Sequence, residues 1–230
     1  MPQSTIRRFT LISAGVAIGA MSSMALGAPT ADAQTAQAKV VDVKKSKVFV
    51  VGDSLTVGAA PYLRRTLGPK VRSLSIDAQV GRFTGAGISK LRTTQAKQAQ
   101  IWVIALGTND GPNPAQTQKN VNKVMLMAGK RSVIWVNVVR PGGYGGVNRV
   151  LHQADKSRSN LTVLDWASVI RSTSSLLTGD QVHLTSYGYR IRAKLTARAV
   201  LALDTTSKLV ESAVRLSEED ISVGDRNGLR

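Results

Sequence analysis

Short apolar runs that end abruptly in polar turns constrain the fold of this chain more than any other feature. Val48–Val51 is one such run, and it stops at Gly52–Ser54. Ile101–Leu106 is another, and it stops at Gly107–Asp110. Continuous apolar runs of this length are typical of strands that are buried on both faces, as they are in a parallel sheet.

Segments of helical composition alternate with these runs along the chain. We expect strands at about Lys47–Val51, Val71–Ile76, Ile101–Leu106, Ser132–Val139 and Leu161–Trp166. We expect helices at about Leu55–Leu67, Ala86–Gln98, Ala115–Ala128, Val147–Lys156 and Ser186–Leu203. Pro61 either opens or bends the first of these helices. Five strands that alternate with helices predict an α/β fold with a parallel sheet covered on both faces.

The turns that follow the strands gather at one edge of such a sheet, because crossovers between parallel strands are right-handed. Gly52–Ser54, Gly81, Asn109 and the loop Gly142–Gly146 all follow predicted strands. In open α/β sheets ligands bind at this edge, and the free N–H groups of a helix start favour negative charge. Ser54 lies at such a start, where it is either a reactive group or a residue that caps the helix.

Composition excludes several kinds of site. The 230-residue chain has no cysteine, which rules out disulfides, cysteine-ligated metals and thiol catalysis. Its two histidines, His152 and His183, are too isolated to suggest a zinc site. No P-loop or dinucleotide-binding glycine motif follows the first strand. We therefore expect neither a metal nor a cofactor.

The chain is strongly basic, with 31 Lys and Arg against 14 Asp and Glu and a net charge of +17. Such a surface favours polyanions, for example nucleic acid, anionic lipid or acidic wall polymers. A basic surface that only confers solubility would have the same composition. Glutamate occurs only at Glu211, Glu218 and Glu219, near the end of the chain. Acid–base chemistry in the predicted domain therefore depends on a few aspartates and two histidines.

The first residues have the pattern of an export signal. Arg7 and Arg8 precede an uncharged apolar segment, and Ala31–Ala33 matches an A-x-A cleavage site. We expect a signal peptide at residues 1–33, or as far as 38, a linker at 34–46, the folded domain at 47–203 and a partly helical or disordered tail at 204–230. An uncleaved membrane anchor is the alternative. We expect a secreted or cell-envelope-associated protein whose export route, general or twin-arginine, is open.

Ser54 has a candidate base and a candidate orienting carboxylate near the end of the domain. Nucleophilic catalysis by serine needs a base within hydrogen-bond reach and a group that orients the base. Asp180 precedes His183 by three residues, which in a turn places both side chains on one face. His152 has Asp155 three residues after it, but it lies in an amphipathic helical segment, where a surface or packing histidine is usual. We therefore favour His183 as the base.

Candidate donors for an oxyanion lie at three strand exits. The backbone N–H of Ser54 is at a helix start, Gly81 allows close approach of the backbone, and the Asn109 amide is a fixed donor. Each has an ordinary interpretation too, Gly81 as a turn residue and Asn109 as a turn or cap residue. Three donors at one edge favour an active site.

Three motifs and one glycine together resemble the SGNH, or GDSL, hydrolase family. GDSL at Gly52–Leu55, Gly81, GTND at Gly107–Asp110 and DQVH at Asp180–His183 follow the order of the family's sequence blocks. The resemblance extends over about residues 47–202 and implies a flavodoxin-like, three-layer α/β/α sandwich.

The same resemblance implies roles for individual residues. It implies Ser54 as nucleophile, His183 as base and Asp180 as the group that orients the base. It also implies Ser54, Gly81 and Asn109 as oxyanion donors, without a metal.

A narrower similarity is found in two other segments. DAQVGR at Asp77–Arg82 and VLDWA at Val163–Ala167 are similar to the SGNH domain that is fused to membrane acyltransferases of bacterial envelopes. Because we expect this chain to lack the membrane domain of those proteins, their transfer activity does not follow from the similarity.

These patterns predict an exported serine esterase that cleaves ester-linked acyl groups through an acyl-enzyme. The expected substrates are short acyl groups on envelope glycans, such as an acylated polysaccharide, with Tyr144 of the glycine-rich loop as a candidate substrate contact. An O-acyltransferase that uses the same acyl-enzyme and a non-catalytic module that binds the cell wall or another polyanion are the alternatives. We expect electrostatic association with anionic envelope polymers and no nucleic-acid partner; the sequence leaves the oligomeric state open, with a monomer as the default.

Overall fold

Five parallel strands form one sheet in the order β2-β1-β3-β4-β5. The strands are β1 (Lys47–Gly52), β2 (Ser73–Ala78), β3 (Ile101–Ala105), β4 (Ser132–Val136) and β5 (Leu161–Leu164). The computed structural model describes residues 41–204; the predicted export signal and the predicted tail beyond residue 204 lie outside the described residues. This strand order is that of flavodoxin-like folds, so the predicted fold class is confirmed.

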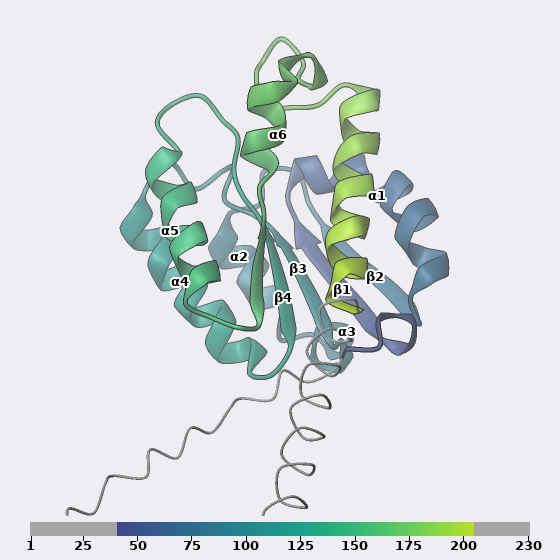
Figure 1. Cartoon of the computed structure of the whole chain (residues 1–230). Coiled ribbons are helices and arrows are strands. Elements are labelled where there is room, and N and C mark those ends of the chain that lie inside the picture. The colour runs from purple at the N-terminus through teal and green to yellow at the C-terminus, as the bar shows by residue number, and fades with distance from the viewer. Residues whose placement is uncertain (1–40, 205–230) are drawn as a thin grey trace, which may run out of the picture. The chain divides into compact units, whose positions relative to one another are not determined.

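Helices cover both faces of the sheet (Figure 1). They are α1 (Ser54–Leu67), α2 (Thr84–Lys90), α3 (Thr94–Gln98), α4 (Pro114–Ala128), α5 (Gly145–Lys156) and α6 (Trp166–Ser172). Single 3-10 turns form η1 (Val43–Lys45), η2 (Gly68–Lys70) and η3 (Ser174–Leu176). A last helix occupies residues 186–204. Within residues 41–204, no helix has the length and apolarity that a membrane span requires.

Alternate side chains of each strand enter two separate cores. In β3, Ile101 and Val103 pack in the core that includes α1, α6 and the last helix. Trp102 and Ile104 pack in the core that includes α2, α3, α4 and α5. The pleat of a strand directs successive side chains to opposite faces. Burial on both faces therefore explains why the strands are continuous apolar runs in the sequence.

The single helix predicted at Ala86–Gln98 is wrong. α2 ends at Lys90 and α3 begins at Thr94. The hydroxyl of Thr93 accepts the N–H of Ala96 at 3.4 Å and caps α3. A threonine that bonds to the backbone in this way favours a new helix start over continuation of the old helix.

The predicted strands Ser132–Val139 and Leu161–Trp166 are both too long. β4 ends at Val136, because the N–H and C=O groups of Val138 pair with the Asn148 side chain at 2.9 and 2.8 Å. β5 ends at Leu164, because the Asp165 side chain accepts the N–H of Ser168 and caps α6. α6 has no counterpart among the predicted helices.

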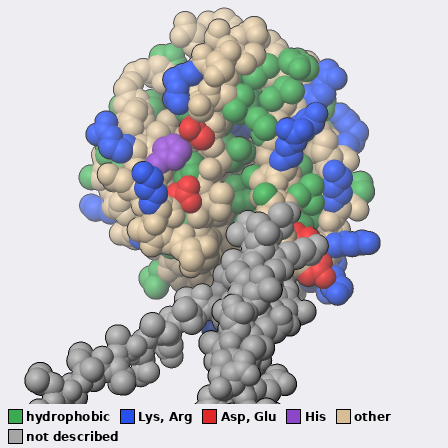
Figure 2. Space-filling view, viewed as in Figure 1, with side chains coloured by type: hydrophobic (Ala, Val, Ile, Leu, Met, Phe, Trp, Pro, Cys, Tyr) green, Lys and Arg blue, Asp and Glu red, His purple; other side chains and the backbone are tan. Residues whose placement is uncertain are grey.

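Charge is unevenly distributed on the surface. On the face seen in Figure 2, acidic side chains are few, whereas Lys and Arg side chains lie around the margin. This distribution accords with the net charge of +17.

Candidate active site

The residue Ser54 is the first of α1 and lies where β1 ends. The Asp53 side chain caps the helix by accepting the N–H of Leu55 at 3.0 Å, so the Ser54 hydroxyl is not the cap. A Cβ on Gly52 would lie 1.9 Å from Oγ1 of Thr56, so only glycine permits the chain to pass this close to the helix. The local sequence therefore leaves the Ser54 hydroxyl available.

His183 contacts Ser54 and Asp180 with its two ring nitrogens. Nε2 lies 3.1 Å from Oγ of Ser54, and Nδ1 lies 2.6 Å from Oδ2 of Asp180. A carboxylate only accepts hydrogen bonds, so Nδ1 carries the proton and Nε2 is free to accept the Ser54 hydroxyl. The structure thus brings together the three residues that the sequence predicted as nucleophile, base and orienting group.

The Asp180 carboxylate is held by its own loop. Its Oδ1 accepts the N–H groups of Val182 and His183 at 3.0 and 2.9 Å and the hydroxyl of Thr178 at 2.7 Å. Gln181 adopts a φ of 58°, which closes this tight turn. The hydrogen bond from the His183 ring, followed by those from Val182 and Thr178, holds the pKa of Asp180 well below its usual range. Asp180 therefore remains a carboxylate at neutral pH.

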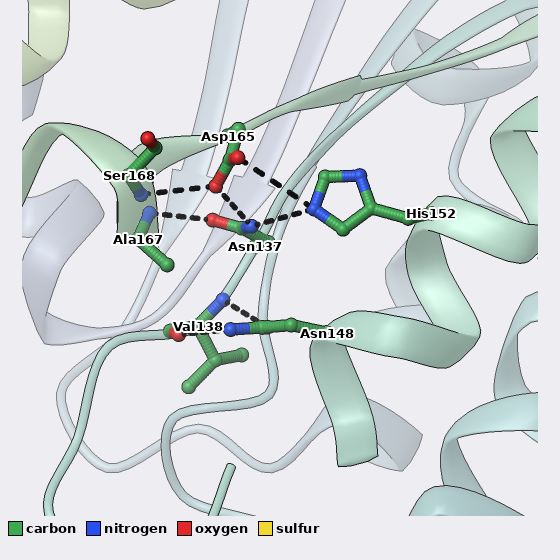
Figure 3. Close-up of polar contacts among 7 residues, drawn as sticks. All are labelled: Asn137, Val138, Asn148, His152, Asp165, Ala167 and Ser168. Atoms are coloured by element: carbon green, nitrogen blue, oxygen red, sulfur yellow. Dashed lines mark hydrogen bonds and ion pairs between the residues drawn. The ribbon is translucent and has the colours of Figure 1, made fainter. Parts of the chain in front are cut away.

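The other histidine belongs to a separate cluster at the ends of β4 and β5 (Figure 3). Nε2 of His152 lies 3.4 Å from the Asn137 amide nitrogen and 3.8 Å from Oδ2 of Asp165. The same amide nitrogen donates to Oδ1 of Asp165 at 2.8 Å. His152 thus faces Asp165, not Asp155, and the structure gives it no contact with Ser54.

Three candidate oxyanion donors follow three neighbouring strands. Gly81 follows β2, Ser54 follows β1 and Asn109 follows β3. Among the described residues, the backbone N–H groups of Ser54 and Gly81 have no acceptor. The Asn109 amide donates one hydrogen to the carbonyl of Arg82 at 3.1 Å, which leaves its second hydrogen for a ligand. Gly81 has a φ of +72° and open space where a Cβ would be, so its backbone is accessible.

Arg82 connects these strand exits, and the sequence motifs assigned it no role. Its buried guanidinium donates to the carbonyl of Gly52 at 3.3 Å, to the carbonyl of Asp77 at 2.7 Å and to Oδ1 of Asp77 at 2.6 Å. Its own carbonyl holds Asn109. Arg82 therefore connects the ends of β1 and β2 to the loop after β3. The DAQVGR segment was the only sequence signal for this residue.

The candidate substrate contact Tyr144 is buried, with 6% of its surface exposed. Its hydroxyl donates to the carbonyl of Thr108 at 3.3 Å, and Arg140 donates to the same carbonyl at 2.8 Å. Both residues follow β4, so this loop supports the segment that contains Asn109. These contacts are structural, and they do not support a direct role of Tyr144 in binding substrate.

Exposed apolar side chains cluster along the sequence around the candidate site. Among residues 41–204, five large apolar side chains are exposed, and four of them flank site residues. Val57 lies one turn after Ser54, Val80 and Phe83 flank the Gly81–Arg82 segment, and Tyr187 lies four residues after His183. These four exposed apolar side chains are therefore close to site residues in the chain.

Two buried opposite charges, Asp53 and Arg192, interact electrostatically but form no hydrogen bond or ion pair with each other. Asp53 is fully buried, and Arg192 of the last helix is 4% exposed. Burial raises the pKa of Asp53, and the positive charge of Arg192 opposes this rise. Burial lowers the pKa of Arg192 to about 10, and the Asp53 carboxylate opposes that change. The Arg192 guanidinium also stacks 5.2 Å from the centre of the Trp166 ring.

No group of three or more histidine, aspartate or glutamate side chains converges as metal ligands within the described residues. The groups that the structure brings together at the candidate site are a serine, an imidazole and a carboxylate, with amide donors at the neighbouring strand exits.

Several solved structures share this fold. A lipase/acylhydrolase from Enterococcus faecalis has a TM-score of 0.59 and 19% identity, covering 67% of this chain and 95% of that one. The C-terminal catalytic domain of Streptococcus pneumoniae peptidoglycan O-acetyltransferase A (OatA) has a TM-score of 0.57 and 21% identity, covering 71% and 95%. A lipolytic protein of the G-D-S-L family from Desulfitobacterium hafniense has a TM-score of 0.56 and 16% identity, covering 67% and 99%. The fold is therefore the SGNH hydrolase fold that the motifs predicted.

Sequence relatives point to one branch of proteins with this fold. The O-acetyltransferase OatA of Staphylococcus aureus is 29% identical over 179 residues, which is 76% of this chain and 28% of that protein. The peptidoglycan O-acetyltransferase OatA of Listeria monocytogenes is 31% identical over 150 residues, which is 62% of this chain and 22% of that protein. The chain thus matches about a quarter of the length of these relatives. No protein-family model matches it.

Proposed function

We propose that this chain, which has the SGNH hydrolase fold, is an exported serine esterase that removes short acyl groups from glycans of the cell envelope. One observation carries the proposal, namely the continuous hydrogen-bond chain from Ser54 through His183 to Asp180. Such a chain is the arrangement that makes a serine hydroxyl nucleophilic at neutral pH.

In the first half of the reaction, Oγ of Ser54 attacks the carbonyl carbon of the ester, and its proton moves to Nε2 of His183. The carbonyl oxygen becomes an oxyanion, which the N–H groups of Ser54 and Gly81 and the Asn109 amide stabilise. The bond to the sugar oxygen then breaks, and Nε2 returns the proton to that oxygen. Asp180 stays ionised and stabilises the imidazolium while the ring carries the extra proton.

In the second half, a hydroxyl group attacks the acyl-enzyme. His183 removes the proton from the attacking oxygen, the ester bond to Ser54 breaks, and the serine regains its hydrogen. When water attacks, the product is a free carboxylic acid and the enzyme is an esterase. When a sugar hydroxyl attacks, the product is a new ester and the enzyme is an acyltransferase.

The similarity to OatA favours transfer as the second candidate function. Both sequence relatives are named O-acetyltransferases, and one is named for peptidoglycan. These names also support an acetyl group as the acyl group and an envelope glycan as its carrier. The predicted export signal and the net charge of +17 are consistent with work at an envelope that is rich in anionic polymers.

A serine-directed probe and an ester assay test the proposal together. Purified full-length protein should gain one methylsulfonyl group on treatment with methylsulfonyl fluoride, and it should release p-nitrophenol from p-nitrophenyl acetate. In Ser54→Ala both signals should be lost, with hydrolysis reduced by about a thousandfold or more. The exposed Ser89 supplies the matched control, and Ser89→Ala should behave like the wild type.

The alternatives give different results. A Ser54→Ala protein with unchanged activity would exclude this serine as nucleophile. Absence of labelling in the wild type would favour the non-catalytic binding module. Addition of a chitooligosaccharide acceptor separates the two catalytic functions, because a transferase yields acetylated oligosaccharide by mass spectrometry and an esterase yields only acetate.

A further inference from the structure

The edge of the sheet opposite Ser54 is unusually basic. Each strand is preceded within four residues by a basic residue, and no acidic residue lies in any of these five segments. One such residue for each strand is Lys45, Arg72, Lys97, Lys130 and Arg158, before β1, β2, β3, β4 and β5 respectively. Because all five strands are parallel, their starts lie along one edge, and these residues form a basic row there.

Backbone hydrogen bonds connect the strand starts in sequence. Arg72 donates to the carbonyl of Ser46 at 3.0 Å, and Gln100 donates to the carbonyl of Lys47 at 3.0 Å. Ser132 donates to the carbonyl of Gln100 at 3.1 Å, and Val133 donates to the carbonyl of Asn160 at 2.8 Å. Neighbouring strands lie about 4.8 Å apart, so the basic row is about 20 Å long.

A cavity of about 380 Å³ lies in the middle of this row. Its charged lining consists of Lys45, Lys97, Lys130 and Arg131, with Asp42 as the only acid. Lys45 pairs with Asp42 at 3.1 Å, but both side chains are largely exposed, so this pair contributes little. The lining therefore carries a clear excess of positive charge.

The positively charged side chains that line the cavity differ in their hydrogen-bond partners. The Arg131 guanidinium donates to the carbonyls of Ala99, Lys97 and Ala128 at 3.0, 2.7 and 3.1 Å, which fixes it in the wall of the cavity. The ammonium groups of Lys97 and Lys130 have no partner among the described residues. Lys97 lies in the last turn of α3 and Lys130 lies two residues after the end of α4, where a helix dipole favours a positive charge, whereas Lys45 lies in a single 3-10 turn.

We propose that this edge binds a polyanionic chain that carries phosphate or carboxylate groups at intervals, and that the cavity holds one of these groups between Lys45, Lys97 and Lys130. The length of the basic row favours a polymer over a single anion. β1 has six residues, which at about 3.3 Å each separates the cavity from Ser54 by about 20 Å. The polymer and the reacting ester would therefore be bound at once, and the binding does not depend on the proposed acyl chemistry.

The test compares two variants that lose the same charge. K45Q/K97Q/K130Q removes the cavity cations, and K119Q/K123Q/R149Q removes three exposed cations of α4 and α5. Affinity of the full-length proteins for long-chain polyphosphate and for polygalacturonate is measured by titration at several salt concentrations. We expect the cavity variant to bind about tenfold more weakly and to have a shallower salt dependence, by about two to three ions, than the wild type. The control variant should lose less than about threefold.

Several outcomes would overturn the proposal. Equal losses in both variants would mean that net charge alone attracts the polymer, and an absence of binding in the wild type would exclude the site. Inorganic phosphate that competes as strongly as polyphosphate would indicate a single-anion site. A DNA duplex that binds more tightly than both polymers would indicate a nucleic-acid site. The polyphosphate and polygalacturonate arms distinguish a phosphate-bearing partner from a carboxylate-bearing one, and unchanged thermal midpoints confirm that both variants are folded.

Discussion

The two carboxylate oxygens of Asp180 accept hydrogen bonds from different groups. Oδ1 accepts the hydrogen bonds that shape the loop, whereas Oδ2 accepts only the Nδ1 proton of His183. The loop can therefore stay intact when the interaction with His183 is changed. This separation makes Asp180 suitable for testing orientation of the base without unfolding the turn.

We expect Asp180→Asn to lower kcat/KM for p-nitrophenyl acetate by about 10²-fold to 10⁴-fold. The asparagine oxygen can replace Oδ1 in the loop, but its NH₂ group would face Nδ1 and force the proton onto Nε2. Nε2 then cannot accept the Ser54 hydroxyl. Because the pKa of Asp180 lies below its usual value of 3.8, the wild type keeps the carboxylate between pH 5 and 8. A Thr178→Val variant, which removes the hydroxyl contacts to Oδ1 of Asp180 and to the carbonyl of His183 but leaves Oδ2 unchanged, is the control. Equal activity in Asp180→Asn and wild type would exclude the orienting role.

Phe83 lies two residues after Gly81 in the chain, and 59% of its surface is exposed. We expect Phe83→Ala to raise KM for esters about fivefold to twentyfold while kcat and the thermal midpoint stay unchanged. The exposed ring buries little apolar surface in the folded protein unless a bound ester covers it. Leu126→Ala on α4 removes a side chain that is 85% exposed and should change neither constant. A lower thermal midpoint in Phe83→Ala would indicate that the ring is structural.

At the scale of elements, the junction of β5 and α6 depends on one carboxylate. Oδ1 of Asp165 accepts the N–H of Ser168 at 3.0 Å and the amide of Asn137 at 2.8 Å. Partial burial raises the pKa of Asp165, but the hydrogen bonds from Asn137 and Ser168 and the charge of His152 outweigh it, so the pKa is lowered. The carboxylate thus stabilises the start of α6 and the end of β4.

We expect Asp165→Ala to reduce the free energy of unfolding by about 1–2 kcal/mol at neutral pH, as loss of a helix cap does. A lowered pKa in the folded state means that the ionised group stabilises the fold above the unfolded value of 3.8 and loses this effect as the pH falls below it. The difference between variant and wild type should therefore be smaller near pH 3 than at pH 7 in urea titrations. Asp155→Ala on α5 is the control. A difference that is the same at both pH values would contradict the ionised cap.

Sequence patterns predicted the elements whose signals are local. β1 and β3 are continuous apolar runs, and α4 begins at a proline, so their positions follow from nearby residues alone. The end of β4 depends on Asn148, which lies ten residues after Val138. Such contacts between a side chain and the backbone form only once α5 has packed, so the local sequence around β4 does not predict them.

The same distinction applies to the candidate site. Ser54, Asp180 and His183 lie in short motifs whose spacing suggested their juxtaposition, and the structure brings them together. No short motif predicts the role of Arg82, because its contact with Gly52 depends on the pairing of β1 with β2. The burial of Tyr144 likewise depends on how the loop after β4 folds onto Thr108.

At the scale of the whole molecule, the buried charges of Asp53, before α1, and Arg192, in the last helix, act on each other electrostatically without a hydrogen bond or ion pair between them. Each is buried, and each influences the pKa of the other. Removal of one buried charge leaves the other without its counter-charge, which costs more than an exposed pair would. The charge of Arg192 therefore stabilises the ionised form of Asp53, the residue that caps α1.

We expect Arg192→Met to lower the free energy of unfolding by about 2–4 kcal/mol at neutral pH. Without Arg192 the pKa of Asp53, already raised above 3.8, rises further. The Asp53 carboxyl of the variant then ionises at a lower pH in the unfolded chain than in the folded one. The loss in free energy of unfolding, relative to the wild type, should therefore grow as the pH increases above about 4. Urea titrations at pH 4 and pH 7.5 measure this change. Lys194→Met, on the exposed side of the same helix, should have little effect at either pH. A loss that shrinks with rising pH would contradict the electrostatic interaction between the two charges.

The hydrogen bond between Ser54 and His183 joins residues 129 positions apart. Parallel strands pair through contacts between residues far apart in the sequence, so folds of this kind form slowly. During synthesis, Ser54 is made long before His183, the residue that we propose activates it. The proposed acyl transfer would therefore begin only after His183 has been made and packed against Ser54, so ester turnover can serve as a kinetic reporter of the refolding that joins these two residues, with no added label.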